Sequence, residues 1–108
     1  MSEGEIVVLV TVGNGAEAKV IAGSLVGEKL AACVQLVGPV RSIYRWHDEV
    51  HDEEEWLLVI KSRADLFELI EARVRALHSY DTPEVIALPV SAGSQPYLEW
   101  LSKSVRPV

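Results

Sequence analysis

The chain has 108 residues, a formal net charge of −6 at pH 7, and a composition that is 49% hydrophobic and 24% charged. These values predict one globular domain spanning residues 1–108, because cores of this size rarely divide and the apolar content is too high for a disordered chain. They argue against nucleic acid as a partner, since phosphate binding requires a basic face and the ten Lys and Arg residues are scattered.

Cysteine usage and the first residues bear on the compartment. Cys33 is the only cysteine, so the chain cannot form an intramolecular disulfide. The opening stretch MSEGEIVVLVTV carries acids where a signal peptide needs positive charge, and its apolar run is too short to span a bilayer. We therefore expect a cytoplasmic protein with no membrane partner.

The first third of the chain predicts a strand followed by a helix. Residues 6–12 form a continuous β-branched apolar run, which is typical of a central strand covered on both faces, and Gly13, Asn14 and Gly15 end it. Residues 16–30 change to a helical period. The side of this helix that we expect to be buried carries Ala18, Ile21, Ala22, Leu25 and Val26.

Residues 33–46 and 50–61 predict two long paired strands. Gly38 and Pro39 interrupt the first strand, and proline cannot donate a ladder hydrogen bond, so we expect a bulge or bend there, at a sheet edge. Either His47-Asp48 or the next pair makes the turn between the strands.

The acidic stretch RWHDEVHDEEEW, residues 45–56, holds two of the three histidines. On a helix, His47 and His51 would share one face and could bind zinc. At a hairpin tip they lie roughly 10 Å apart at ~3.3 Å per residue, too far for one zinc ion whose nitrogen ligands sit at about 2 Å. We therefore predict a solvated acidic ridge. The alternative is weak, multi-site binding of divalent cations by carboxylates from more than one subunit.

The second half of the chain predicts helix, strand and helix. Ser62 and Asp65 fit a cap that starts a helix, residues 84–90 form the fourth strand, and Ser94 and Pro96 begin a short last helix. The apolar side of the second helix consists of Leu66, Phe67, Ile70, Val74 and Leu77. This order predicts an α/β (α+β) fold, a ferredoxin-like split βαβ sandwich with an antiparallel sheet and two helices on one face.

The predicted hairpin is longer than the helices that should cover it. Strands of 12 to 14 residues reach roughly 40–45 Å, whereas helices of about 15 residues reach only ~22 Å. The overhang carries Ile43, Tyr44, Trp46 and Val50. A monomer exposing such a strip with open strand edges should aggregate, so we expect another subunit to cover it in a closed cyclic assembly.

Five ordered stretches resemble the CutA divalent-cation tolerance proteins: KLAACVQL, GPVRSIYRWHDEV, LLVIKSR, RVRALHSYDTPEVIALPV and YLEWL. The resemblance covers about residues 5–104. It implies a tight, very stable homotrimer with β-pairing between subunits, and a link to tolerance of copper and other divalent metals. Three positions depart from the family pattern, namely Gln35, Asp48 and Ser79. Of the copper ligands proposed in some members, only His78 has a counterpart here, because Val10 and Leu77 occupy the other positions.

Several residues are candidates for a site. His78, His47 and His51 are the candidate metal ligands, although His78 could equally cap the last carbonyls of its helix. Cys33 is either a soft metal ligand or a small buried hydrophobe. Cys33, Lys61, Tyr80 and Glu84 are candidates for a cleft between subunits. The alternative is that Lys61 and Glu84 form a structural ion pair and that Tyr80 packs with its hydroxyl satisfied.

Together these features and the resemblance predict a homotrimer that is not an enzyme and that acts in tolerance of divalent metal ions. No nucleophile elbow or phosphate-cradling glycine loop occurs in the sequence. We expect no required cofactor, weak binding of copper or zinc at most, and no partners other than the chain itself and divalent cations. One alternative is a regulatory trimer of the nitrogen-regulatory PII plan that binds a small molecule between subunits. The other is a purely structural or anchoring trimer.

Overall fold

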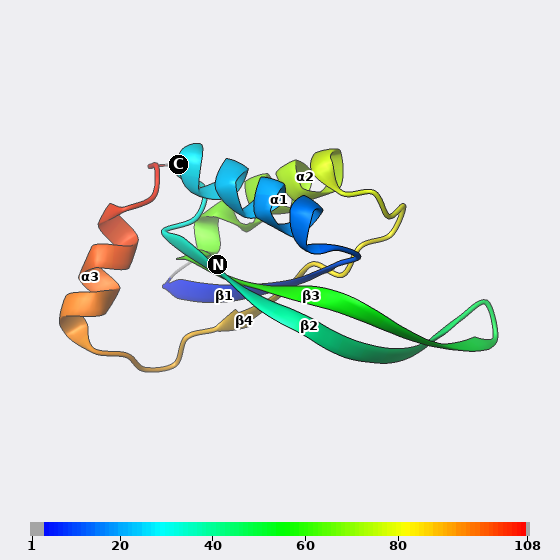
Figure 1. Cartoon of the computed structure of the whole chain (residues 1–108). Helices are drawn as coiled ribbons and strands as arrows, with labels where there is room; N and C mark the ends of the chain where they lie inside the picture. The colour runs from blue at the N-terminus through cyan, green and yellow to red at the C-terminus, as the bar shows by residue number, and fades with distance from the viewer. Residues whose placement is uncertain (1–3, 108) are drawn as a thin grey trace.

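The computed structural model describes residues 4–107 and has the predicted ferredoxin-like architecture (Figure 1). The elements are β1 (Glu5–Val12), α1 (Gly15–Gly27), β2 (Cys33–Trp46), β3 (Glu49–Arg63), a 3₁₀ turn (Ala64–Leu66), α2 (Phe67–Leu77), β4 (Ile86–Pro89) and α3 (Gln95–Lys103). The sheet order is β2-β3-β1-β4, and every neighbouring pair is antiparallel. Helices α1 and α2 cover one face, and α3 lies across one end of the sheet.

The core lies between the sheet and these two helices. Strand β1 alternates, so that Ile6, Val8, Val10 and Val12 are buried while the residues between them are half-buried. The opposing helix residues include Ile21, Leu25, Ile70 and Val74, each fully buried. The opposite face of the sheet, which we call the open face, carries the half-buried set. The predicted cover on both faces of β1 is therefore complete on one face only.

The ends of the helices show where local sequence signals were right and where they failed. Asn14 caps α1, and its side-chain oxygen accepts a hydrogen bond from the Glu17 amide at 2.8 Å. The helix ends at Gly27, and Val26, which we expected to be buried, is exposed. The predicted Ser62 cap is wrong. Ser62 belongs to β3, is fully buried, and donates its hydroxyl to the Leu30 carbonyl at 2.7 Å.

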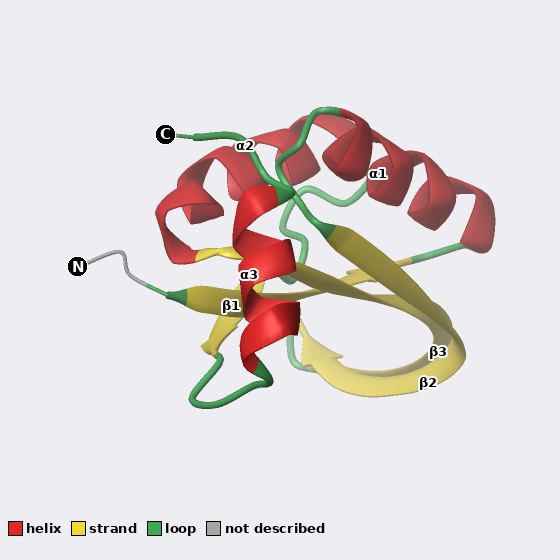
Figure 2. Cartoon of the chain, turned by 90° about the vertical axis from the view of Figure 1, so that its left-hand side faces the viewer, coloured by secondary structure: helices red, strands yellow, loops and turns green. Residues whose placement is uncertain are grey.

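Strands β2 and β3 continue beyond the rest of the sheet as a hairpin arm, residues 40–55. The β1–β3 ladder ends at Val12 and Trp56. The seven residues Glu49–Glu55 therefore extend about 23 Å further at ~3.3 Å per residue. The turn is His47-Asp48, whose φ values of 53° and 63° define a type I′ turn. Figure 2 shows the arm curving away from α1 and α2.

A bulge separates the arm from the base of the hairpin, as predicted at Gly38-Pro39. The pairing shifts by one residue between Val37 and Val40, so Gly38 and Pro39 together stand opposite Trp56.

No helix within residues 4–107 is long and apolar enough to cross a membrane.

Candidate functional site

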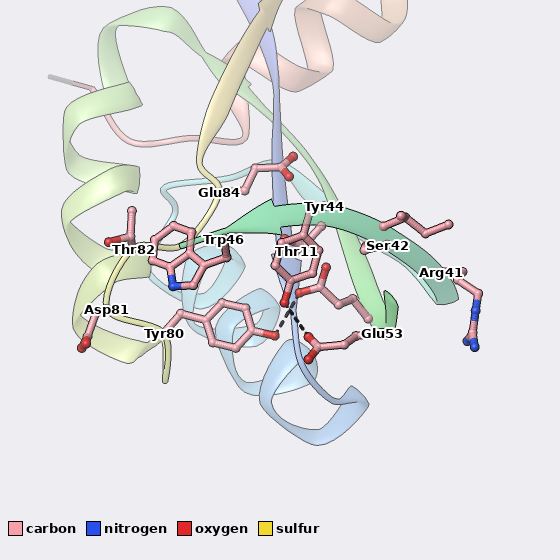
Figure 3. Close-up of a pocket in the computed structure, with 12 residues that line it drawn as sticks. Thr11, Arg41, Ser42, Tyr44, Trp46, Glu53, Tyr80, Asp81, Thr82 and Glu84 are labelled. Carbon is pink, nitrogen blue, oxygen red and sulfur yellow. Dashed lines mark hydrogen bonds between the residues drawn. The ribbon is translucent and has the colours of Figure 1, made fainter. Parts of the chain in front are cut away.

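A concavity lies where the arm leaves the sheet (Figure 3). It has a volume of about 740 Å³, and we call it the hairpin cavity. Tyr44 and Trp46 on β2 form one part of its wall. Thr11 at the end of β1 and the loop before β4 form another. The full lining is Thr11, Arg41, Ser42, Ile43, Tyr44, Trp46, Glu53, Glu55, Tyr80, Asp81, Thr82 and Glu84.

Strand pleating places most of the arm residues of the cavity on one side. Val40, Ser42, Tyr44 and Trp46 pair directly with Glu55, Glu53, His51 and Glu49. Directly opposed residues of an antiparallel pair point to the same face, so aromatic rings and carboxylates share the concave side. Ile43 and Val50 occur at the alternate positions, where 69% and 63% of their surface is exposed.

Two tyrosine hydroxyls donate to two of the cavity carboxylates. The Tyr44 hydroxyl donates to Glu53 Oε1 at 2.6 Å, and the Tyr80 hydroxyl donates to Glu55 Oε2 at 2.9 Å. Glu55 is only 6% exposed, whereas Glu53 is exposed. A buried carboxylate without a partner is unfavourable, so the charge-assisted hydrogen bond from Tyr80 stabilises the buried Glu55. The Tyr80 hydroxyl is thus satisfied within the chain, as the alternative to the cleft between subunits expected.

Hydrogen bonding, desolvation and nearby carboxylates raise the pKa values of three groups that line this cavity. The hydrogen bond to Glu53, with desolvation and the charges of Glu53 and Glu55, raises the pKa of Tyr44 to about 12. Burial, the bond to Glu55 and the nearby carboxylates also raise the pKa of Tyr80. Partial desolvation raises the pKa of Glu84, and the Glu55 charge adds to this effect. Both tyrosines are therefore neutral hydrogen-bond donors at physiological pH.

The acidic stretch at residues 45–56 is mostly the solvated ridge that we predicted, with one exception. Glu49, Asp52, Glu53 and Glu54 are exposed, but Glu55 is buried beneath Tyr80. Its burial has a tertiary cause, because the loop before β4 folds over the strand. Sequence reasoning missed Glu53 and Glu55 as site residues. The available signal was their spacing: Glu53 and Glu55 are two residues apart on β3, opposite Ser42 and Val40, so they point to the same face of the arm.

The two histidines of the arm lie against aromatic rings. The His51 ring stacks on Tyr44 at a centroid distance of 5.2 Å, and its Nδ1 lies 4.0 Å from Glu53 Oε2. The His47 ring, in the turn, meets Trp46 edge to face at 5.0 Å. Within residues 4–107, no group of three or more His, Cys, Asp or Glu side chains is arranged to hold a metal ion.

His78, the family-like metal candidate, is buried and fully hydrogen-bonded. Its Nδ1 accepts the Tyr80 amide hydrogen at 3.0 Å, and this bond identifies Nε2 as the protonated nitrogen, which donates to the Thr11 carbonyl at 2.8 Å. The imidazole therefore joins the end of β1 to the loop before β4. The alternative, that His78 caps its helix, holds for the backbone only: its amide donates to the Val74 carbonyl at 2.8 Å, whereas the ring bonds none of the last carbonyls of α2. Glu17 holds the same loop by accepting from the Ser79 amide and hydroxyl at 2.8 and 2.9 Å.

Cys33 and Lys61 lie away from Tyr80 and Glu84. They pair directly across β2 and β3 on the open face, level with Val7 of β1. That position is four residues from Thr11, roughly 13 Å at ~3.3 Å per residue. The Cys33 sulfur lies 3.7 Å from the Tyr97 hydroxyl, and Lys61 donates to Gln35. Within the described chain Lys61 therefore bonds Gln35 and not Glu84, so the two residues form no ion pair within one subunit.

The fold and this site define a class: a ferredoxin-like α/β protein whose long hairpin arm encloses an acidic, aromatic cavity. Comparison with known proteins then gives the family. The sequence profile described as CutA1 divalent ion tolerance protein matches residues 6–104, and the chain belongs to this family.

Similar proteins come from plants and bacteria. The chain is 52% identical over 101 residues to Protein CutA, chloroplastic, of Arabidopsis thaliana, a match that spans 94% of this chain and 56% of that protein. It is 46% identical over 100 residues to the divalent-cation tolerance protein CutA of Thermus thermophilus, covering 93% of this chain and 97% of that one. The crystal structure of CutA1 from Oryza sativa superposes with a TM-score of 0.95 at 47% identity, covering 99% and 98% of the two chains.

Proposed function

We propose that the chain forms a homotrimer that acts, without catalysis, in tolerance of divalent metal ions, copper among them. The match of residues 6–104 to the divalent ion tolerance family carries this proposal. It requires no resident cofactor, and the chain works with divalent cations and with copies of itself. The lone cysteine, Cys33, suits a reducing cytoplasm, although the Arabidopsis relative bears a chloroplast description.

The arm and the sheet edges support self-assembly. Ile43 and Val50 are the most exposed large apolar side chains on the arm, and an exposed apolar strip favours a protein contact. Strands β2 and β4 are the two edges of the sheet and run in opposite directions. Strand β4 of one subunit beside β2 of the next would therefore continue the antiparallel ladder and close a ring. Tyr44 and Trp46 would lie at the border of this contact.

The predicted cleft between subunits can also form only if the chain assembles. Cys33 and Lys61 lie at one place in the chain, and Tyr80 and Glu84 at another. A cleft that contains all four must draw one pair from each of two neighbouring subunits. Head-to-tail contact between different sheet edges is an arrangement that can bring unlike parts of two copies together.

Native mass spectrometry of protein purified without chelator tests the assembly. The expected mass is three times the 11.9 kDa chain mass. Ile43→Asp should shift the population toward smaller species, because it places a charge in the proposed apolar contact. Glu54→Gln, at an exposed position of the same arm, is the control and should leave the mass unchanged. A monomeric wild type at micromolar concentration would end the trimer proposal.

Copper titration tests the metal part. His47 and His51 are partly exposed imidazoles, whereas both nitrogens of His78 are engaged. We therefore expect weak Cu²⁺ binding that a His47→Ala, His51→Ala double variant reduces and that His78→Ala reduces much less. Calorimetry measures both. A tight site that survives the double variant and disappears in His78→Ala would reverse this assignment.

Growth measures the biological role. A bacterium that lacks its own family member should grow at higher copper concentrations when it expresses this chain. Equal growth with and without the chain would contradict the tolerance role, whatever the oligomeric state.

A further inference from the structure

Asn14-Gly15 is the dipeptide of this chain that is most prone to deamidation. Asn14 is the only asparagine in the sequence, and a glycine follows it. The main-chain nitrogen after an asparagine can attack the side-chain amide carbon, and glycine obstructs that attack least because it has no Cβ and gives the backbone more freedom. The dipeptide lies where β1 turns into α1 (Figure 1).

The reaction is a cyclisation followed by hydrolysis. The Gly15 nitrogen loses its proton to a solvent base and forms a bond with Cγ of Asn14. The bond between Cγ and the side-chain nitrogen breaks, and that nitrogen leaves as ammonia with a proton from water. The resulting succinimide takes up one water molecule. Opening at Cγ gives aspartate, whereas opening at the main-chain carbonyl gives isoaspartate, in which the main chain runs through Cβ.

The folded backbone opposes this ring closure. The five-membered ring requires the Gly15 nitrogen to be nearly eclipsed with Cβ of Asn14, but Asn14 is extended, with φ −152° and ψ 161°. The angle ψ must therefore rotate. The Asn14 side-chain oxygen accepts from the Glu17 amide at 2.8 Å, and its carbonyl accepts from the Ala18 amide at 3.1 Å. Rotation of the residue strains both of these bonds, which begin α1.

Packing on both sides of the dipeptide resists the same rotation. A Cβ built on Gly15 would lie 3.2 Å from the Trp56 ring, so the backbone of Gly15 lies against the indole. Ala18, in the first turn of the helix, is fully buried, and β1 is paired with β3 along its whole length. These contacts lie within one subunit, so assembly retains them. Ring closure therefore requires the first turn of α1 to open locally.

The two products would affect α1 in opposite ways. Aspartate keeps an oxygen for the Glu17 amide and adds a negative charge at the positive end of the helix, which is favourable. Isoaspartate adds a carbon to the main chain directly before Gly15, which displaces the start of the helix from Trp56. Because Trp56 stands opposite the bulge at the base of the arm, the isoaspartyl form would disturb the junction between the arm and the sheet.

We propose that Asn14-Gly15 is a site of spontaneous deamidation that the capped first turn of α1 keeps closed. Each opening of this turn permits cyclisation, so the products accumulate with the age of the folded protein. The site goes beyond the metal-tolerance role and does not rest on it. Nor does it rest on assembly, because every group that holds the dipeptide belongs to the same chain.

Mass spectrometry of the full-length protein in mildly alkaline buffer measures the reaction, and enzymatic methylation of isoaspartyl carboxylates measures that product. We expect one deamidation per chain, which peptide mapping places at Asn14. The chain unfolded in concentrated urea should react at least tenfold faster than the folded chain. Asn14→Asp should form no succinimide at a comparable rate, and its urea midpoint should equal or exceed that of wild type.

A pair of substitutions at Glu17 isolates the cap. Glu17→Pro removes the amide hydrogen that the Asn14 side chain accepts, and proline is tolerated in the first turn of a helix, where amides have no carbonyl partner within the helix. Glu17→Ala keeps that amide and loses only the carboxylate, which Glu17→Pro loses as well. With both variants folded by circular dichroism, Glu17→Pro should deamidate at least fivefold faster than Glu17→Ala.

Wild type in urea below its unfolding transition gives a second test if Glu17→Pro does not fold. Opening of a single turn exposes little surface, so the deamidation rate should hardly change with urea. A rate that rises in parallel with global unfolding would contradict local opening. The proposal is also overturned by equal rates in the folded and unfolded wild type, by equal rates in the two folded Glu17 variants, or by an unfolded chain that does not react.

Discussion

Tyr80→Phe isolates the hydrogen bond that holds the loop before β4 to the arm. The substitution removes one oxygen and leaves Glu55, 6% exposed, without the donor that lies 2.9 Å from its carboxylate. A hydrogen bond to a charged group contributes roughly 1.5–3 kcal/mol. Tyr80 itself is 37% exposed, so water and salt reduce this value. We expect a loss of about 1–2 kcal/mol per subunit at pH 7.

Tyr44→Phe is the matched control, because it deletes a hydroxyl that donates to Glu53 at 2.6 Å in an exposed pair. Water can replace that donor, so the loss of stability should be clearly smaller. Urea unfolding followed by fluorescence measures both variants at one fixed protein concentration, since assembly makes apparent stability concentration-dependent. Equal losses would show that burial of Glu55 does not set the cost, and no loss for Tyr80→Phe would refute the bond itself.

The pH dependence of the Tyr80→Phe effect has a defined sign. The folded state raises the pKa of Tyr80 above its ordinary value of about 10. The stabilisation by this group is therefore complete below pH ~10 and is lost as pH rises toward the raised value. The difference between wild type and Tyr80→Phe should be constant from pH 7 to 9 and should shrink above pH 10. A difference that grows with alkaline pH would contradict this reasoning.

Three further substitutions test the base of the hairpin and the first helix. Gly38→Ala should destabilise by about 1–3 kcal/mol, because the new Cβ would lie 2.5 Å from the Trp56 ring; Gly23→Ala, with no neighbour within 4 Å, should be neutral or stabilising by up to ~1 kcal/mol. Asn14→Ala should cost about 1 kcal/mol through loss of its cap on α1. Urea midpoints measure all three, and an undiminished midpoint in Gly38→Ala or Asn14→Ala would refute the corresponding contact.

The fold could be predicted because its signals are local. Period-2 and period-3.6 patterns located the strands and helices, and Gly38-Pro39 and His47-Asp48 marked the bulge and the turn. Ser62 shows the limit of such signals. Its hydroxyl had a local capping role available, but the strand continues through it and a buried carbonyl from another segment accepts its hydrogen bond.

Only part of the candidate site could be predicted from the sequence, because contacts between residues distant in sequence define the rest. The hydroxyl of Tyr80 meets Glu55, 25 residues earlier, and the ring of His78 meets the Thr11 carbonyl, 67 residues earlier. In the sequence, Glu55 is one acid in an acidic run and His78 is a histidine after a helix. Nothing local distinguishes a covered carboxylate from a solvated one, or an imidazole that joins two segments from a free ligand.

The bulge at Gly38-Pro39 couples the number of residues in β2 to the curvature of the arm. Val37–Leu57 and Val40–Glu55 are paired on either side of it, with two residues facing one between them. A relative one residue shorter at this point could keep every pair in both halves of the hairpin, yet it would lose the added twist that a bulge imposes. Its arm would be straighter. An insertion or deletion here would therefore redirect the whole arm, although it would break none of the pairs on either side of the bulge.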